Sequence, residues 1–464
     1  MASMLSSPVS VVVVLDDSTT VDGGISEFLY RKLWGFFSLL TETSKQGYST
    51  SQASSGSEIG REEPVYISLV SLHPRVLSGQ IDSLVGLGRA LQRVGHNVKL
   101  LAPFDTSGLL ERSLINLDEG PSGLIAAANR MLQTLPKIIT AAEQSDLLYL
   151  ALPTPAFGAL GDFLATRISC PMVVAFEGHL ADARVLLRPA RLRESWKTYL
   201  PLWGVNNGFW GRLGVHHGQR YIVSSRVQEE ELIALGFPRE RVAVISNLVD
   251  AEKLVGVAHN VARNWLGLPD DRILIGYIGH FNDVKGVDIL ARAFTHVVRS
   301  EPRAHLVLAW SGQGKRERVT RYLDGHMTAV SWLGKVLVGT FLSALDVLVL
   351  PYRSTAGQGA FPSLPIEAFH MGCPLVMTRL PLLAELEGGS GGALLAEPES
   401  VESLQEALLA SVTDAQMRYR MREAQRRLIQ QRFGVTALLP QYEAVFDQAR
   451  LGVIGRVIRR TVAA

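Results

Sequence analysis

A complete strand–loop–helix–strand unit occupies residues 347–378. The apolar residues 347–351 predict a buried strand, and the small residues that follow predict a loop. Ser363 is a candidate N-cap for a helix, and Gly372 is placed to end that helix before another apolar run. Because helices between apolar strands are typical of parallel sheets, this unit predicts an α/β fold.

The loop before this helix is a candidate anion site. Small residues at the start of a helix leave backbone N–H groups and the positive end of the helix dipole open to an anion. Glu367, which we expect in the first helical turn, adds a carboxylate that can accept hydrogen bonds from ribose hydroxyls. The alternative is an ordinary strand–helix crossover, and most such units bind nothing. The presence of Glu367 favours a nucleotide site over this alternative.

Length and composition narrow the class of protein. A chain of 464 residues has room for two domains, and 46 basic against 44 acidic residues argue against a nucleic-acid-binding protein. Cys170 and Cys373 lie far apart in sequence and indicate neither a disulfide framework nor a zinc site. This cysteine usage predicts a cytoplasmic protein. No apolar run reaches the roughly 18–20 residues that span a bilayer.

A second strand–helix–strand unit opens the first predicted domain. Residues 66–70 and 98–101 predict strands, and residues 80–94 predict a helix with one apolar face. The unit has no full Gly-x-Gly-x-x-Gly, so a nicotinamide cofactor is poorly supported.

The domain boundary is predicted where the apolar periodicity fades, between Asp250 and Asp271. A helix over about residues 436–448 is long enough to cross back to the first domain. The predicted organisation has an N-terminal extension with a Ser/Gly-rich linker, a first domain for the acceptor, a second domain for the nucleotide, and a crossover helix with a basic tail. These parts cover residues 1–63, 64–250, 251–435 and 436–464.

Three side chains lie where predicted strands end. His179 follows strand 172–176, at the edge where open α/β sheets bind ligands, and a surface-loop histidine is an equal alternative. Lys285 lies in a loop before a helix and suits a phosphate, although such a lysine is more often only solvated. Gln313 belongs to the small loop 311–314, which suits close approach by a ligand.

Residues 184–220 depart from the strand–helix pattern. They hold six arginines and one lysine against the single acid Glu194, with tryptophan, tyrosine and phenylalanine interleaved. One interpretation is a segment that binds the acceptor or a membrane surface. The alternative, which the pattern favours, is a solvated amphipathic helix pair with aromatic side chains on the core.

Four segments of the chain, with Glu385 and residues 392–395 after the last of them, together carry a family pattern. The segments are residues 78–103, 221–250, 279–294 and 361–378. In this order they resemble the retaining family-four glycosyltransferases of the GT-B fold. The first is similar to that family's glycine loop, helix and strand, the second to its interdomain junction, the third to its donor-phosphate loop, and the fourth to its nucleotide-sugar loop.

This resemblance implies two Rossmann-like domains that face a central cleft. It also implies a hexosyltransferase that moves a sugar from a nucleotide-sugar donor to a glycan, lipid or small-molecule acceptor, with retention of configuration and without a metal. The nucleotide-sugar would be a substrate, so no cofactor is expected. Such enzymes act in cell-envelope or polysaccharide biosynthesis, in the cytoplasm or at the inner face of the membrane.

The resemblance also implies roles for single residues. Lys285 would stabilise the leaving diphosphate, His179 would contact the donor sugar, and His280 stands where the family has an arginine ahead of the lysine. The donor would be bound by loop backbone, by residues that read the base and by Glu367 on the ribose. The donor-binding residues implied are Gly79, Gln313, Leu333, Gly334, Gln358, Gly359, Ala360, Phe361, Ser363 and Glu367.

Two departures from the family pattern leave alternatives open. His280 replaces the usual arginine, and Gly359, with Gln358 beside it, stands where the family has a glutamate that seven residues separate from Glu367. A catalytically weak or inactive GT-B protein that binds a nucleotide or glycan is one alternative. A GT-B nucleotide-sugar epimerase is the other, and the Lys285/Glu367 pair fits it less well.

Overall fold

The computed structural model describes residues 64–71, 79–102, 124–152, 161, 164–178, 220–249, 254–314, 316–323, 325–355 and 362–463. The predictions for residues 1–63 and for nearly all of the segment 184–220 lie outside these residues. All described elements belong to one compact unit, which begins at Glu63.

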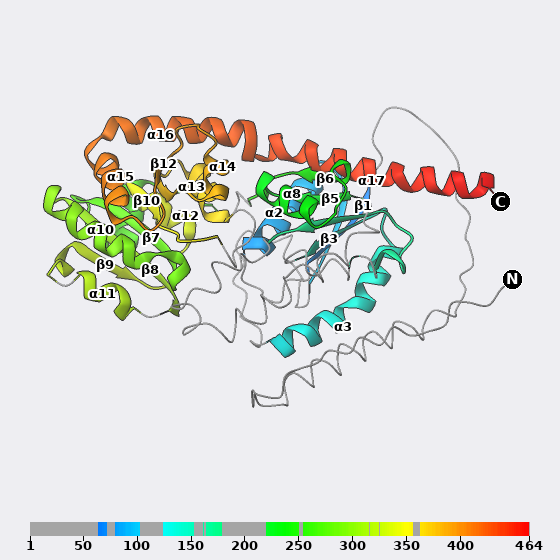
Figure 1. Ribbon diagram of the computed structural model, residues 1–464, viewed down its shortest axis with the longest axis horizontal. Coiled ribbons are helices and arrows are strands. Elements are labelled where there is room, and N and C mark those ends of the chain that lie inside the picture. Colours follow the sequence, from blue (N-terminus) through cyan, green and yellow to red (C-terminus); the bar gives the residue numbers. More distant parts are fainter. Residues whose placement is uncertain are drawn as a thin grey trace. The chain divides into compact units, whose positions relative to one another are not determined.

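The first sheet has six parallel strands in the order β2-β1-β3-β4-β5-β6 (Figure 1). Its strands are β1 (Tyr66–Ser71), β2 (Asn97–Leu101), β3 (Leu147–Leu152), β4 (Met172–Phe176), β5 (Arg220–Val223) and β6 (Val242–Val244). The helices between them include α2 (Gly79–Arg93), α3 (Leu124–Glu143) and α8 (Arg226–Ala234). Strand β3 is buried over its whole length, as is typical of a parallel sheet with both faces covered.

The second sheet also has six parallel strands, in the order β12-β11-β10-β7-β8-β9 (Figure 1). Its strands are β7 (Ile273–Phe281), β8 (Ala304–Gly314), β9 (Val330–Leu333), β10 (Val347–Leu350), β11 (Leu375–Thr378) and β12 (Ala393–Ala396). The helices are α9 (His259–Trp265), α10 (Val287–Ser300), α11 (Glu317–Leu323), α12 (Val338–Ala344), α13 (Ser363–Met371), α14 (Pro381–Glu387), α15 (Val401–Thr413) and α16 (Ala415–Leu428).

Strand β10 shows why this sheet is apolar throughout. Alternate side chains of a strand point to opposite faces, so each face of β10 enters a different core. Leu348 and Leu350 pack in the cluster that contains Phe369 of α13, whereas Val347 and Val349 pack in the cluster that contains Phe294 of α10. The Val-Leu-Val-Leu run therefore serves two helical layers at once.

The chain returns to the first sheet through its last helix. The π-turn η6 (Ile429–Phe433) joins α16 to α17 (Val435–Ala463). Leu438, Tyr442 and Phe446 of α17 belong to the same core cluster as Tyr149 of β3, and the rings of Tyr149 and Phe446 meet edge to face at 6.0 Å. The predicted fold class, with its crossover helix, is confirmed.

Several local predictions are corrected. Helix α13 has Pro362 at its N-cap, so Ser363 is the first helical residue and no side chain caps the helix. Glu367 consequently lies in the second turn. Residues 311–314 continue strand β8 and are no loop, because β8 follows the long strand β7 as far as Phe281. Gly372 ends α13 in the left-handed conformation, as predicted.

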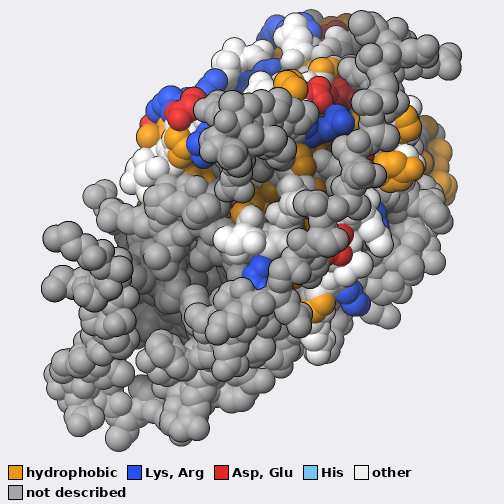
Figure 2. All heavy atoms as spheres, turned by 90° about the vertical axis from the view of Figure 1, so that its right-hand side faces the viewer, with side chains coloured by type: hydrophobic (Ala, Val, Ile, Leu, Met, Phe, Trp, Pro, Cys, Tyr) orange, Lys and Arg blue, Asp and Glu red, His pale blue; other side chains and the backbone are white. Residues whose placement is uncertain are grey.

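The interval predicted to lack periodicity contains a helix. Helix α9 has only seven residues, and Arg263 within it is buried against Asp346, with the guanidinium Nη2 2.7 Å from a carboxylate oxygen. Both cysteines are free. Among the described residues, no helix is long and apolar enough to cross a membrane. On the face drawn in Figure 2, the described Lys and Arg side chains are interspersed with Asp and Glu.

Candidate functional site

The loop after β7 forms a tight turn against the end of β10. Asn282 accepts a hydrogen bond at its side-chain oxygen from the backbone N–H of Lys285, at 3.1 Å, which closes the short 3-10 turn η4 (Asp283–Lys285). Gly286 follows at φ +63°, and a Cβ there would collide with the carbonyl oxygen of Pro351. Glycine is therefore required at this position for both conformation and space.

Arg353, just after β10, fastens this loop. Its guanidinium donates to both carboxylate oxygens of Asp288, at 2.8 and 2.6 Å, and to the backbone carbonyl of Asp283, at 2.8 Å. Its backbone N–H donates to the carbonyl of Val284 at 2.9 Å. Burial opposes the charge of Arg353, but the hydrogen bonds and charge of Asp288 and the charge of Asp283 outweigh it and keep its pKa above the ordinary value. The sequence gives no sign of this arrangement, because the partners are 65 and 70 residues away.

Lys285 projects from this loop onto an aromatic ring. Its Nζ lies 4.1 Å from the ring centroid of Tyr352, within the range of a cation–π interaction. The amine is enclosed, and this burial lowers its pKa to about 7. Lys285 is therefore held where a small change in nearby charge changes its protonation near neutral pH.

Tyr352 connects Lys285 with Glu367. The phenol is buried, and burial followed by the negative charge of Glu367 raises the pKa of Tyr352 well above its ordinary value. Tyr277 of β7 is also buried and donates to the carbonyl oxygen of His280 at 2.7 Å. Burial raises the pKa of Tyr277 in the same way, and the charge that Tyr352 would gain on ionisation adds to the effect. Tyr352 thus contacts the Lys285 amine and feels the charge of Glu367, and Tyr277 binds the backbone carbonyl of His280.

An aromatic cluster lies where β7, β8 and β9 end. Phe281 packs against Trp310 at 6.1 Å and Trp332 at 6.0 Å between ring centroids, and the Arg316 guanidinium lies 3.9 Å from the Trp332 centroid. Leu333 and Gly334 follow Trp332 directly, and Gly334 is exposed with open space where a Cβ would be. The predicted base-reading residues therefore lie at an accessible edge beside this cluster.

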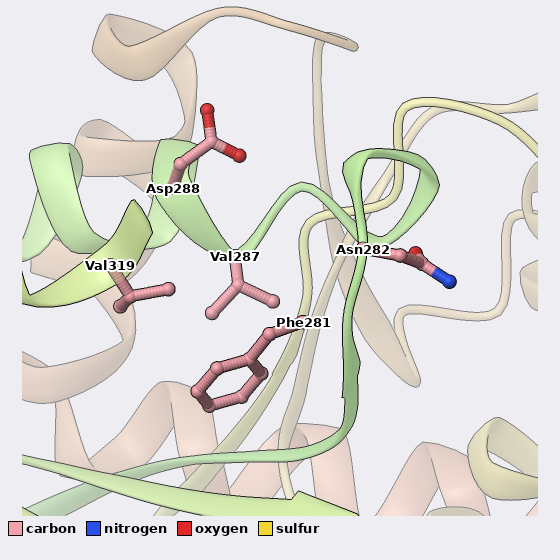
Figure 3. Close-up of a pocket in the computed structure, with 5 residues that line it drawn as sticks. All are labelled: Phe281, Asn282, Val287, Asp288 and Val319. Carbon is pink, nitrogen blue, oxygen red and sulfur yellow. The ribbon is translucent and has the colours of Figure 1, made fainter. Parts of the chain in front are cut away.

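A small pocket lies next to the Lys285 loop (Figure 3). Val287, Val319 and the ring of Phe281 point toward one another, while the carboxylate of Asp288 points away from that ring. The pocket, which Asn282 also lines, has room for little more than a water molecule. It is too small for a sugar nucleotide and contributes to the packing of the loop.

In the first domain, a buried polar cluster follows β4. The Gln228 side-chain amide donates to the carbonyl oxygens of Phe176 and Gly178, at 3.2 Å each, and fixes the turn between them. Glu177 in this turn is 7% exposed, and burial raises its pKa to about 8. The ring of Tyr149 lies 6.3 Å from that of Tyr442 of α17, whose hydroxyl donates to the carbonyl of Ser246 at 3.2 Å.

The remaining predicted site residues divide into two groups. Gly79 is the first residue of α2, Gln313 is near the end of β8, and Ser363 begins α13. His179, Gln358, Gly359, Ala360 and Phe361 lie outside the described residues. Glu385, from the resembling segment, accepts the backbone N–H groups of Arg226 at 2.6 Å and Val227 at 3.3 Å, at the start of α8.

Two parallel six-stranded sheets joined by a returning helix define an α/β protein of the GT-B class. Within that class, residues 78–253 match the family Glycosyltransferase Family 4, and residues 272–414 match the family Glycosyl transferases group 1. Each match covers less than half of the chain, one over the region of the first sheet and the other over the region of the second.

Similar proteins agree with this assignment. The chain is 29% identical over 197 residues to D-inositol 3-phosphate glycosyltransferase 2 of Catenulispora acidiphila, covering 39% of this chain and 45% of that protein. It thus matches less than half the length of this curated relative. A glycosyltransferase structure from Rickettsia africae has a TM-score of 0.60 at 13% identity, with 83% of this chain and 99% of that chain covered. Anabaena HepE, in complex with UDP and glucose, has a TM-score of 0.58 at 16% identity, with 82% and 99% covered.

Proposed function

We propose that this protein is a glycosyltransferase that moves a sugar from a nucleotide-sugar donor to an acceptor with retention of configuration. The observation that supports the proposal is the Lys285 amine held on Tyr352, which also feels the charge of Glu367, at the carboxyl edge of the second sheet within residues 272–414, which match the family Glycosyl transferases group 1. Open α/β sheets bind ligands at this edge.

The donor chemistry assigns each group a task. A nucleoside diphosphate gains negative charge as it leaves, and a fixed cation beside it stabilises the transition state more than the ground state. Lys285 supplies that cation, and the start of α13 adds backbone N–H groups. The phosphates also favour the protonated amine, so donor binding restores the charge that burial removes from Lys285. Glu367 accepts hydrogen bonds from the ribose.

We also assign the type of sugar, the absence of a metal and the roles of first-domain residues. We assign hexosyl transfer without a metal or cofactor, with His179 at the donor sugar and Gly79 allowing close approach of the first domain. Gln313, Leu333 and Gly334 complete the base side, and Gln358, Gly359, Ala360, Phe361 and Ser363 the phosphate side. His280 supplies one hydrogen bond where the family has an arginine.

The acceptor is a glycan, a lipid or a small molecule. The name of the Catenulispora relative makes a polyol phosphate such as D-inositol 3-phosphate a sensible first compound to test. Residues 184–220 would bring a lipid acceptor within reach by peripheral contact at the inner face of the membrane. Co-sedimentation with anionic vesicles, repeated with Arg188, Arg191 and Arg193 changed to Glu, tests that contact.

A panel of UDP-, GDP-, ADP- and TDP-sugars in a thermal-shift assay tests the function, with UDP-glucose first because HepE was crystallised with UDP and glucose. A ligand at a hundredfold over its Kd adds about 2.7 kcal/mol of stability. The best donor is then incubated with acceptors, while nucleoside diphosphate release and the anomeric configuration of the product are followed with and without EDTA. Binding without turnover would indicate an inactive GT-B protein, and conversion of the donor without acceptor would indicate an epimerase.

A further inference from the structure

We propose that Tyr352 is a positioning residue that holds the Lys285 ammonium in place for the diphosphate of the donor. This inference rests on the proposed function and adds a residue that the sequence did not suggest. Tyr352 touches no reacting atom in this scheme, because its ring acts only through Lys285.

The geometry supports this role from both sides of the contact. The Lys285 Nζ lies 4.1 Å from the centroid of the Tyr352 ring, on its face, where the ring's negative potential attracts a cation. The ring itself cannot move easily, because it is 2% exposed and the backbone carbonyl of Tyr352 accepts a hydrogen bond from the Thr378 hydroxyl at 2.7 Å. Tyr352 is thus a fixed surface on which a flexible lysine is held.

The loop that carries Lys285 is fixed to the same segment. Arg353, the next residue, bonds Asp283 and Asp288 on either side of Lys285, and Gly286 packs on the carbonyl of Pro351. Residues 351–353 therefore fix both the backbone and the amine of Lys285. A free lysine side chain has many rotamers, and such a scaffold removes most of that freedom before the donor arrives.

The charged and titratable groups beside the Lys285 loop and Tyr352 come from four elements. Asp283 of η4 and Asp288 of α10 are engaged by Arg353, and the Glu367 charge acts on Tyr352 from α13. The others are Tyr277 and His280 of β7. Burial disfavours the ammonium form of Lys285, and the face of the Tyr352 ring favours it. Loss of the ring face should therefore lower the pKa of Lys285 further.

The test is the pH dependence of kcat/KM, which reports groups of the free enzyme. In the wild type, kcat/KM should fall as pH rises through the pKa of Lys285. Tyr352→Leu, which keeps the site apolar, should move this fall about one pH unit lower and reduce kcat/KM about tenfold at pH 8. Tyr352→Phe keeps the ring face and should leave the profile in place. Tyr149→Phe, at a buried tyrosine of the first-domain core, is the matched control and should not move it.

A second variant separates the ring's charge distribution from its shape. Pentafluorophenylalanine at position 352 fills the same space with a reversed quadrupole and should move the profile in the same direction as Tyr352→Leu. This comparison decides the question even where Tyr352→Leu folds poorly. The Kd of UDP, measured at pH 6 and pH 9 for each variant, provides a readout independent of turnover.

The outcomes distinguish this inference from the proposed function. A profile that is unchanged in both Tyr352→Leu and the pentafluoro variant, in an enzyme that binds UDP and turns over its donor, would overturn the role of Tyr352. A wild type that binds no UDP, GDP, ADP or TDP would instead overturn the proposed function. A shift in the two variants, with none in the Phe variants, supports the positioning role.

Discussion

Glu177 of the first domain and Lys285 of the second lie just beyond the carboxyl ends of β4 and β7. Burial moves their pKa values toward neutrality from opposite sides, to about 8 for the carboxyl group and about 7 for the amine. The two surroundings differ. Glu177 lies among Tyr149, Tyr442 and the backbone that Gln228 fixes, under the crossover helix, whereas Lys285 lies in a glycine-flanked loop at the end of a sheet.

The comparison shows that a perturbed pKa alone does not identify a functional group. Glu177 is almost fully enclosed by the first-domain core and α17, so its neutral form serves packing. The Lys285 residue as a whole is partly exposed although its amine is enclosed, and Gly286 and Arg353 shape the loop that carries it. A catalytic role is therefore expected for the lysine and a structural one for the acid.

The largest expected effect is on turnover. Lys285→Ala should lower kcat by about 10²–10³, the range for loss of one charge-stabilising group. Lys285→Arg should restore only part of the rate, because a planar guanidinium docks differently from an ammonium. Release of nucleoside diphosphate with the best donor measures both. Glu177→Gln is the control and should retain near wild-type turnover, and a loss there equal to that of Lys285→Ala would break the comparison.

The second-largest expected effect is on stability, and it tests the loop while Lys285 itself is kept. Arg353→Met should reduce the free energy of unfolding by about 2–3 kcal/mol, since it leaves Asp283 and Asp288 with uncompensated charge in partly buried positions. The KM of the donor should rise as the loop loosens. Asp288→Asn, which keeps one acceptor and removes a charge, should cost less. Urea unfolding of the three proteins checks the order, and an Arg353→Met variant as stable as wild type would contradict it.

Sequence predicted the scaffold of this region better than its chemistry. The β10–α13 unit was predictable because the apolar runs and Gly372 act locally, and the start of α13 differed by one residue because Pro362 takes the cap. The contacts of Arg353 and Glu177 depend on residues far away in the chain, so no local pattern reveals them. Helix α9 was missed because seven residues are too few to show a helical period. In the sequence, its buried Arg263 cannot be told from a solvated arginine.

The third effect concerns the acid. The folded-state pKa of Glu177 lies above its ordinary value, so the stability that its protonated form contributes is fully present below about pH 4.5 and is lost as pH rises through about 8. Glu177→Gln should flatten this dependence and be more stable than wild type by about 2 kcal/mol at pH 9, less than the full shift because the native state can admit water. Melting curves from pH 5 to 9 test this, and parallel curves would refute it.

The smallest expected effect is at Lys285, where the pH dependence of stability has the opposite sign to that at Glu177. The folded-state pKa of this amine is lowered from 10.5 to about 7, so between these values the unfolded chain binds the extra proton and stability rises with pH. Lys285→Met removes the titration, and its stability relative to wild type should be greatest below pH 7, by about 1 kcal/mol, and vanish above about pH 10.5. The effect is small because the residue is partly exposed and the Tyr352 ring offsets part of the cost of burying the charge. Urea midpoints at pH 6 and 9.5 measure the stability of Lys285→Met and of Glu177→Gln relative to wild type. This relative stability should fall with pH for Lys285→Met and rise with pH for Glu177→Gln. The same trend in both variants would show that one of the two surroundings has been misassigned.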